Sequence, residues 1–337
     1  MNCAFSHGNS CVSESFLLGC VAGSLISTTL VLHAEKVTTT VSKAWESFFM
    51  WSYPFVLDEY PKLICHYFTG RLGNEMFQYA SILGLAYATN RTAVFMRSEQ
   101  LDTVLEKPTT HPTKQKWLEA RCLKAPKEKY ERSCCTFNDQ LFNLEPDFDY
   151  YIALYLMSWK YFKGADKEIR HALTFKQSIR EEAAEIVRGY RQVFQGSTLI
   201  GVHARKGDLE DDYNTKLGYP TVTAEFFNRT VNYFENLFPK AVFIVASDSV
   251  RWCKANFPPG HTETIMENHS PAVDLLVLAS LDHVAISFGS YSWWAGYLNQ
   301  GKVVYVKNLI TGVPNTSIGN TFGPDGKDFI YPTWTAI

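Results

Sequence analysis

Residues 198–208 read TLIGVHARKGD, an apolar run that ends in a histidine, two cations and a carboxylate. An apolar run of this length, followed by polar residues, is typical of a buried strand in a parallel sheet. His203 and Arg205 are two positions apart, so they share one face of that strand. Ligands of open parallel sheets bind at the carboxyl ends of the strands. We therefore expect a polar site over residues 205–208, with an Arg–Asp ion pair that merely caps the strand as the alternative.

Outward from this stretch, apolar runs alternate with helical stretches in both directions. The expected strands are residues 63–68, 92–96, 198–205, 241–246, 262–266, 283–288 and 302–307. The expected helices are residues 75–89, 168–193, 223–238, 250–256, 272–281 and 292–299. Residues 98–150 show little periodicity and are expected to form loops and short helices. Strands that alternate with helices predict an α/β fold with parallel sheets, most simply as two halves facing a cleft.

The composition bounds the class of protein. The chain has 337 residues, 46% of them hydrophobic, with 32 Lys and Arg against 34 Asp and Glu. This length suits about two domains, and this hydrophobic content excludes a disordered or collagen-like chain. A net charge of −2 argues against nucleic acid as a partner, because phosphate backbones are bound by clustered cations. Ligands with one or two phosphates remain possible, since they need only a local cation.

The N-terminal region contains an uncharged stretch between Glu14 and Glu35. Residues 15–34 are long enough to cross a bilayer of about 30 Å, so we expect a transmembrane signal anchor there. A short tail, residues 1–14, would precede it, and a stem, residues 35–61, would follow. The two lysines after the span leave its orientation open. A buried core helix is the alternative.

Four glycosylation sequons favour a lumenal body. They begin at Asn90, Asn228, Asn268 and Asn315.

Eight cysteines are present, three of them in the tail and the expected span (Cys3, Cys11 and Cys20). The other five are Cys65, Cys122, Cys134, Cys135 and Cys253. Five cysteines allow at most two intramolecular bridges and leave one thiol over. No spacing of Cys and His ligands suggests a zinc site.

A second polar site is expected where the strand over residues 63–68 meets its helix. Residues 70–74 read GRLGN, in which two glycines would let the backbone approach a ligand and the following helix N-terminus would favour an anion. The stretch is not a complete G-x-G-x-x-G motif, so dinucleotide binding is unsupported. A purely structural turn is the alternative.

Two further strands end in polar residues. Asp248, after Ser247, is placed to accept hydrogen bonds from a planar donor edge such as guanine, or to cap the next helix. Ser287 and Ser290 precede a helix, where their hydroxyls and the nearby amides could hold a phosphate.

Two acidic clusters are candidate metal or base sites. Asp147 and Asp149 form a D-x-D pair of the kind that holds a divalent ion, but no clear strand precedes it, so we expect a solvated loop. Asp211 and Asp212 follow Glu210 in a loop expected beside residues 205–208, where they could supply a base or form a solvated turn.

Taken together, these segments resemble the GDP-fucose-dependent α-1,2-fucosyltransferases of glycosyltransferase family 11. The resemblance runs from about Leu63 to the C-terminus. It is carried by GRLGNEMFQYA at 70–80, VHARKGD at 202–208, VASD at 245–248, SYSWWAGYL at 290–298 and PTWTAI at 332–337.

The resemblance implies a GT-B fold of two Rossmann-type domains, an acceptor-side domain over residues 62–195 and a GDP-fucose-binding domain over 196–337. It also implies a type II Golgi membrane protein with a lumenal body. The implied reaction is an inverting, metal-independent transfer of fucose to a galactose-type 2-hydroxyl of a glycan. By the same resemblance Arg205 would hold the β-phosphate, His203 would lie near the guanosine and Asp248 would contact the base.

The expected donor-binding residues are Gly70, Arg71, Gly73, Asn74, His203, Arg205, Lys206, Ser247, Asp248, Ser287 and Ser290. Arg205 and Asp208 are the expected catalytic residues, with Asp211 and Asp212 as further candidates for the base. No metal or other cofactor is expected.

The sequence departs from the family pattern at three positions, with Lys206 in place of Arg, Glu75 in place of Gln and Leu209 in place of Tyr. Three alternatives therefore stay open. They are fucosyl transfer to another linkage, a metal-dependent glycosyltransferase that uses Asp147 and Asp149, and a non-catalytic nucleotide-sugar binding protein.

Overall fold

A computed structural model describes residues 61–106, 112–124, 127–130, 133–306, 308 and 311–337, and those from Pro61 onward form one compact unit. The expected tail and membrane span, with the stem as far as residue 60, lie outside the described residues. Within the described part of the chain, no helix has both the length and the apolar character that crossing a bilayer requires.

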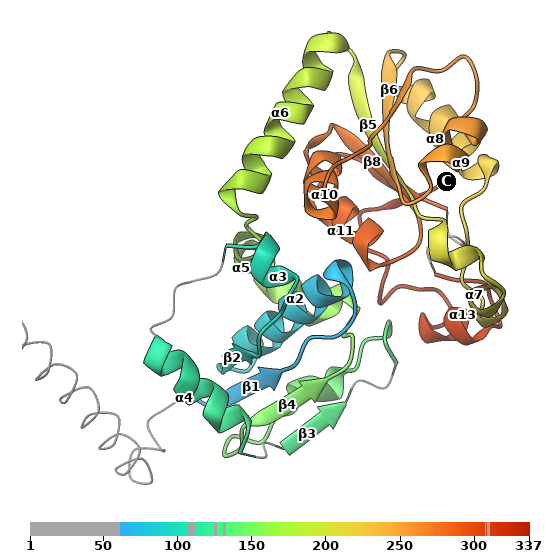
Figure 1. Ribbon diagram of the computed structural model, residues 1–337. Coiled ribbons are helices and arrows are strands. Elements are labelled where there is room, and N and C mark those ends of the chain that lie inside the picture. The colour runs from blue at the N-terminus through green and yellow to red at the C-terminus, as the bar shows by residue number, and fades with distance from the viewer. Residues whose placement is uncertain (1–60, 107–111, 125–126, 131–132, 307, 309–310) are drawn as a thin grey trace, which may run out of the picture. The chain divides into compact units, whose positions relative to one another are not determined.

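The first half of this unit is built on a four-stranded parallel sheet (Figure 1). Its order is β2-β1-β4-β3, with β1 at Leu63–His66, β2 at Thr92–Phe95, β3 at Lys127–Tyr130 and β4 at Tyr150–Ala153. Helix α2 (Leu72–Ala88) packs on β1 and β2, and a Cys65–Cys122 disulfide ties β1 to α4 (Pro112–Cys122). A short helix, α3, covers Leu101–Val104.

The expectation of only loops and short helices over residues 98–150 is wrong, because β3 and the start of β4 lie there. Strand β3 reads Lys-Glu-Lys-Tyr and is mostly exposed at the edge of the sheet. Charged side chains protect an exposed edge from pairing with other chains. The same charges remove the apolar signal by which a strand is recognised in sequence.

The second half contains a six-stranded parallel sheet in the order β10-β9-β8-β5-β6-β7. Its strands are β5 (Thr198–Ala204), β6 (Ala241–Ser247), β7 (Glu263–Ile265), β8 (His283–Ile286), β9 (Val303–Tyr305) and β10 (Thr335–Ala336). The chain runs from β5 outward to β7, then returns to the other side of β5 with β8. This is the doubly wound order, in which a crevice forms where the direction reverses. Here that crevice lies at the ends of β5 and β8.

Helices cover both faces of this sheet, as predicted (Figure 1). Helices α10 (Pro271–Ser280) and α11 (Ser290–Leu298) lie on one face, and α8 (Ala224–Leu237) and α9 (Val250–Asn256) lie on the other. The buried side chains of each face form a separate apolar cluster against the strands. The α/β class with parallel sheets is therefore confirmed.

The single helix expected over residues 168–193 is interrupted. It forms α5 (Asp166–Ala172) and α6 (Gln177–Val193), because Phe175 is buried and pairs with Leu105 in an isolated β-bridge. Helix α6 then packs on α10, and Arg191 forks onto Asp282 with distances of 2.6 and 2.7 Å. The break lets the chain leave the first sheet and join the second.

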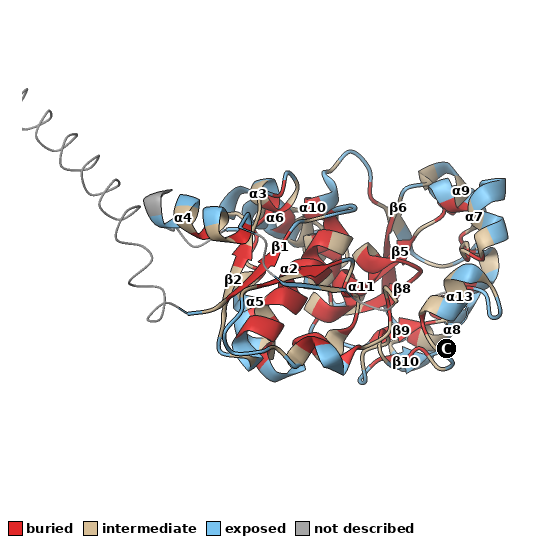
Figure 2. Ribbon diagram, turned by 90° about the horizontal axis from the view of Figure 1, so that it is seen from below, coloured by how far each residue is buried: buried red, intermediate tan, exposed pale blue. Residues whose placement is uncertain are grey.

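Aromatic side chains join the two halves. The Phe77 ring of α2 lies 4.5 Å from that of Trp293 and 5.0 Å from that of Trp294, both on α11. Trp294 Nε1 donates to the Gly73 carbonyl at 2.9 Å. Figure 2 shows buried residues concentrated in the strands and in α2 and α11. This packing fixes the N-terminus of α2 beside the N-terminus of α11.

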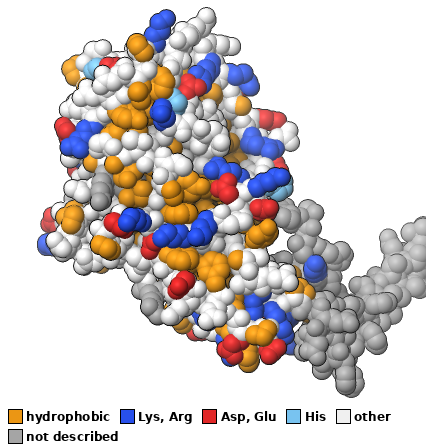
Figure 3. All heavy atoms as spheres, turned by 180° about the vertical axis from the view of Figure 1, so that it is seen from behind, with side chains coloured by type: hydrophobic (Ala, Val, Ile, Leu, Met, Phe, Trp, Pro, Cys, Tyr) orange, Lys and Arg blue, Asp and Glu red, His pale blue; other side chains and the backbone are white. Residues whose placement is uncertain are grey.

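The described residues on the face drawn in Figure 3 carry no large field of one sign. On the face drawn in Figure 3, Lys, Arg, Asp and Glu side chains are interspersed among apolar and neutral ones. This distribution matches the net charge of −2.

Candidate active site

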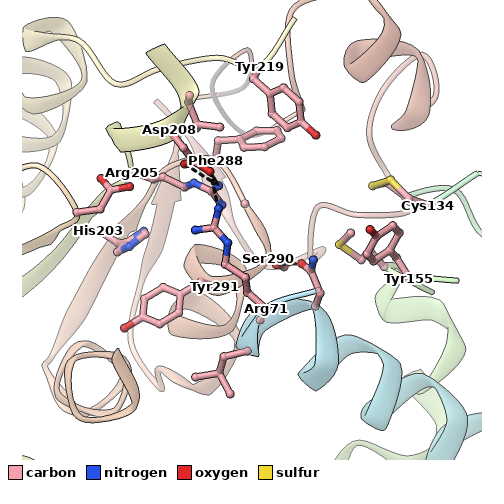
Figure 4. Close-up of a pocket in the computed structure, with 18 of the residues that line it drawn as sticks. Arg71, Cys134, Tyr155, His203, Arg205, Asp208, Tyr219, Phe288, Ser290 and Tyr291 are labelled. Carbon is pink, nitrogen blue, oxygen red and sulfur yellow. Dashed lines mark hydrogen bonds and ion pairs between the residues drawn. A yellow bond between two sulfur atoms is a disulfide. The ribbon is translucent and has the colours of Figure 1, made fainter. Parts of the chain in front are cut away.

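A pocket of about 680 Å³ is lined by residues of both halves. One part, the cation end, contains Arg71, His203, Arg205 and Asp208, beside Ser290 and Tyr291 of α11. The other part, the apolar end, contains Cys134, Cys135, Tyr155, Met157 and Phe322. Figure 4 shows Arg71 and Arg205 pointing toward Asp208, with Cys134 and Tyr155 on the opposite side of the pocket from His203.

Arg205 is the first residue after β5, at the crevice that the strand order creates. Its backbone N–H donates to Ser287 Oγ at 3.0 Å. Gly289 has a φ of 106°, and a Cβ there would come within 3.0 Å of Arg205 Nη1. Gly289 therefore supplies both a left-handed turn and the space that the guanidinium occupies. The structure places this guanidinium in the pocket, with 22% of the side chain exposed.

Asp208 joins the two halves at the cation end. Arg71 Nη2, from the start of α2, lies 2.5 Å from Asp208 Oδ2, and Arg205 Nη2 lies 3.1 Å from Asp208 Oδ1. Burial opposes ionisation of Asp208, but the two guanidiniums hold the pKa of its carboxyl below the usual range. The site is thus a pair of cations that share one carboxylate, an arrangement suited to receive a second anion.

His203 is buried beneath the cations, and its ring centroid lies 4.9 Å from that of Tyr291. Burial, helped by the charge of Arg205, lowers the pKa of His203 to about 3, so the imidazole is neutral at physiological pH. Its Nδ1 is buried without a hydrogen-bond partner in the described residues. Buried polar atoms are normally paired, so this nitrogen marks a position for a ligand atom or a water.

Asp248 and Ser247 also line the pocket. Asp248 Oδ1 accepts the N–H of Lys206 at 2.8 Å, so this carboxylate holds the loop after β5. It does not cap α9, whose N-cap residue is Ser249. Ser247 Oγ donates to the Ala204 carbonyl at 2.6 Å and accepts the N–H of Ser249 at 2.9 Å.

The expected glycine-rich turn is mainly structural. Gly73 lines the pocket, but a Cβ on it would lie 2.4 Å from the backbone N of Tyr291, so helix packing already requires a glycine there. Gly70, with a φ of 93°, lies outside the lining. Asn74 and Ser290 do face the pocket and hydrogen-bond to each other across the two halves. Ser287 lies outside it and acts on the backbone of Arg205.

Lys206 is not brought to the pocket. Its ammonium is buried, 2.5 Å from Glu210 Oε1 and 4.3 Å from the centroid of the Trp252 ring. Glu75 is also buried away from the pocket, where Ser98 and Gln100 donate to its carboxylate. These two departures from the family pattern therefore leave the pocket lining unchanged. Leu209 is the only one of the three that lines it.

The acidic clusters have structural roles. Asp211 caps α7 (Asp212–Leu217) by accepting the N–H of Asn214 at 2.6 Å, and neither Asp211 nor Asp212 lines the pocket. Asp149 forms an ion pair with Arg121 at 2.6 Å and accepts the N–H of Leu63. These contacts make Asp149 a structural residue that holds β1, not a metal ligand. The described residues contain no group of three or more His, Cys, Asp or Glu side chains placed to hold a metal ion.

The cysteines pair as Cys65–Cys122 and Cys134–Cys135, with Cys253 free and buried. This agrees with the expected maximum of two bridges and one remaining thiol. Sequence analysis missed the second bridge as part of the site, together with Tyr155 and Met157. The signal that could have found it is the adjacency of the two cysteines.

All four sequon asparagines are exposed, as glycosylation requires. They are Asn90, Asn228, Asn268 and Asn315.

Comparisons with known proteins agree with the resemblance seen in the sequence. A family model described as Glycosyl transferase family 11 matches residues 28–317. The galactoside alpha-(1,2)-fucosyltransferase 2 of Pongo pygmaeus is 25% identical over 278 residues, covering 80% of this chain and 77% of the relative. The galactoside 2-alpha-L-fucosyltransferase SEC1 of Bos taurus is 26% identical over 273 residues, covering 80% and 72%.

Two solved structures are more distantly similar. The fucosyltransferase NodZ from Bradyrhizobium has a TM-score of 0.46 and 14% identity, covering 70% of this chain and 92% of that one. An Arabidopsis thaliana FUT1 mutant in complex with GDP has a TM-score of 0.47 and 13% identity, covering 82% and 81%.

Proposed function

The chain belongs to glycosyl transferase family 11, and on that premise we propose that it is an α-1,2-fucosyltransferase. It would transfer L-fucose from GDP-fucose to the 2-hydroxyl of a galactose-type residue on a glycan, with inversion and without a metal. The curated relatives are galactoside α-1,2-fucosyltransferases, which supports this donor and this linkage.

One observation carries the proposal, namely that guanidiniums from the two halves of the described unit meet at a single carboxylate. Arg205 comes from the end of β5 and Arg71 from the start of α2, and both contact Asp208. The N-terminus of α11 borders the same space through Gly289 and Ser290. Two cations and a helix N-terminus form a site for a diphosphate.

The proposed reaction is a displacement at the anomeric carbon of fucose. The acceptor oxygen forms a bond to that carbon while the bond from the carbon to the β-phosphate oxygen breaks, and GDP leaves with the electron pair. Negative charge grows on the β-phosphate as that bond breaks. Arg205, fixed by Ser287 and Gly289, stabilises the charge without rearranging.

Asp208 has two roles in this scheme. Before the donor binds, it neutralises Arg71 and Arg205. The diphosphate then replaces it as their partner, and the released carboxylate accepts the proton of the attacking hydroxyl. Of the three carboxylates considered as the base, Asp208 is the one that lines the pocket.

Two alternatives from the sequence have less support. A metal-dependent mechanism through Asp147 and Asp149 would have to remove Asp149 from Arg121 and from the backbone of β1. A non-catalytic binding protein was suggested by Lys206 and Glu75, but both are held outside the pocket.

The proposed location is the Golgi membrane, with a type II anchor and a lumenal body. Two disulfides and four exposed sequons support an oxidising, glycosylating compartment. The anchor itself falls on residues that the structure does not describe.

The test is an acceptor panel with labelled GDP-fucose, with and without EDTA. We expect fucose on the 2-hydroxyl of a galactoside and the same rate in the chelator. Loss of transfer in EDTA that Mn²⁺ restores would contradict the metal-independent mechanism. GDP binding by calorimetry without transfer to any acceptor would contradict the enzyme.

A further inference from the structure

The apolar end of the pocket contains a disulfide between neighbouring residues, Cys134 and Cys135. Both cysteines line the pocket, beside Tyr155 and Met157. No step of the transfer described above uses any of these four residues. Figure 4 shows Cys134 and Tyr155 on the side of the pocket away from His203, which leaves this end free for an acceptor.

Tyr155 is presented by an unusual backbone. It follows β4, and its two neighbours, Leu154 and Leu156, have φ values of 75° and 52°. Leucine rarely adopts this left-handed region because its side chain crowds the backbone. Leu154 is 44% exposed, so burial of its own side chain does not explain the conformation. Strained backbone of this kind clusters at ligand sites, where the surrounding structure enforces it.

The surrounding structure does enforce it. Ser81 Oγ of α2 donates to the Leu156 carbonyl at 2.8 Å, and the N–H of Met157 donates to the Cys134 carbonyl at 2.8 Å. Ser133 Oγ in turn donates to the Thr321 carbonyl at 3.0 Å. The loop after β4 and the disulfide are therefore parts of one fixed platform.

This platform is continuous with the cation end. Arg205, Tyr219 and Tyr155 all line the same pocket (Figure 4). A sugar on the platform would thus lie next to a donor whose diphosphate is held by the arginines.

We propose that the Cys134–Cys135 disulfide, Tyr155 and Met157 form the acceptor platform and that it takes a pyranose with C–H groups gathered on one face. This inference rests on the proposed function. A β-galactopyranoside meets the requirement, because its axial 4-hydroxyl leaves three C–H groups on the opposite face. A β-glucopyranoside differs only at that hydroxyl, which is equatorial, so its C4–H points to the other face and the patch of C3–H, C4–H and C5–H is divided. Aromatic and thioether surfaces pack well against such polarised C–H groups.

The test compares Tyr155→Ala with Tyr155→Phe in the full chain. The matched control is Tyr130→Ala, which removes an exposed tyrosine of β3 in the same half of the molecule. We expect Tyr155→Ala to raise the KM for methyl β-galactoside by about tenfold, with the Kd for GDP unchanged. Tyr155→Phe should restore most of the loss, and Tyr130→Ala should behave as the wild type.

A second variant, the double substitution Cys134→Ser and Cys135→Ser, tests the disulfide in the same assay, and its acceptor KM should also rise. An unchanged acceptor KM in Tyr155→Ala would overturn the proposal. An equal loss of GDP affinity would also overturn it, because the residue would then serve the donor or the fold.

Direct binding separates this proposal from the proposed function. Saturation-transfer NMR with methyl β-galactoside and methyl β-glucoside needs no turnover. If the wild type binds the galactoside and Tyr155→Ala does not, the platform is supported even where no transfer is detected. If galactoside and glucoside bind the wild type equally, the platform does not recognise the apolar face and the proposal fails.

Discussion

A central strand of each sheet carries a buried histidine at or next to its last residue, and the surroundings of the two histidines differ. His66, the last residue of β1, has the Ile152 carbonyl 2.6 Å from Nδ1 and Gln78 Oε1 2.9 Å from Nε2, so an oxygen faces each ring nitrogen and the neutral ring donates to one of them. His203, near the end of β5, has an unpaired and buried Nδ1. The first histidine completes a core, whereas the second lines the pocket.

The difference extends to the loops that follow these strands. After β1, the chain turns into α2 through glycines whose space is filled by the protein itself. After β5, it delivers Arg205 and Asp208 into the pocket. The two halves therefore contribute different groups to the pocket. The six-stranded half provides the fixed cation, and the four-stranded half provides a second cation and most of the apolar end.

The largest effect is expected at Arg205. Replacing it with Ala should lower kcat by about 10²–10³-fold, as for other fixed groups that stabilise charge in a transition state. Arg205→Lys keeps the charge but loses the fork, so it should recover only part of the activity. Steady-state kinetics with GDP-fucose on folded protein provides the measurement. Near-normal turnover by Arg205→Ala would contradict the proposed role of Arg205, at the end of β5, in stabilising the transition state.

A smaller effect is expected at Arg71. Its side chain is 75% exposed, so solvent screens its charge more than that of Arg205. Arg71→Ala should lower kcat/KM for GDP-fucose by about tenfold, roughly the value of one hydrogen bond between charged groups.

Arg180→Ala is the matched control for Arg71, since Arg180 forms an exposed ion pair with Glu106 away from the pocket. If both variants lose the same activity, or neither loses any, the four-stranded half contributes no cation to donor binding.

Much of the six-stranded half could be predicted from the sequence, because its strands β5 and β6 are apolar and buried along their length. Helix α10 begins at Pro271, one residue before the expected helix over residues 272–281. The four-stranded half was less predictable, since β3 is a charged edge strand.

The same contrast holds for the site. The position of Arg205 followed from strand period and strand ends alone. The burial of Lys206 outside the pocket could not be predicted in this way. It depends on contacts with Glu210 and with Trp252 of α9, and no local sequence pattern indicates those contacts. Tyr155 was missed because its placement depends on a backbone conformation that leucine seldom adopts.

The smallest effect concerns acid stability, and it separates the two histidines directly. Burial lowers the pKa of both below the usual value of about 6.5, in His66 against its two hydrogen bonds. Below about pH 6.5 the unfolded chain binds more protons at these histidines than the native chain does. The free energy of unfolding is therefore highest above about pH 6.5 and decreases as the pH drops below it. For His203, with a pKa of about 3, the fall continues to about pH 3. Each histidine contributes at most about 1.4 kcal/mol per pH unit.

The test measures urea unfolding of His203→Gln and His66→Gln between pH 4.5 and 7.5. Both substitutions should flatten the acid dependence, because the titrating group is gone. They should differ at pH 7.5. His66→Gln disturbs a buried hydrogen bond to Ile152 or Gln78 and should cost about 1–3 kcal/mol, whereas His203→Gln disturbs none at Nδ1 and should cost little. Equal losses at pH 7.5 would mean that His203 is a core residue like His66, and that its unpaired nitrogen does not mark a ligand.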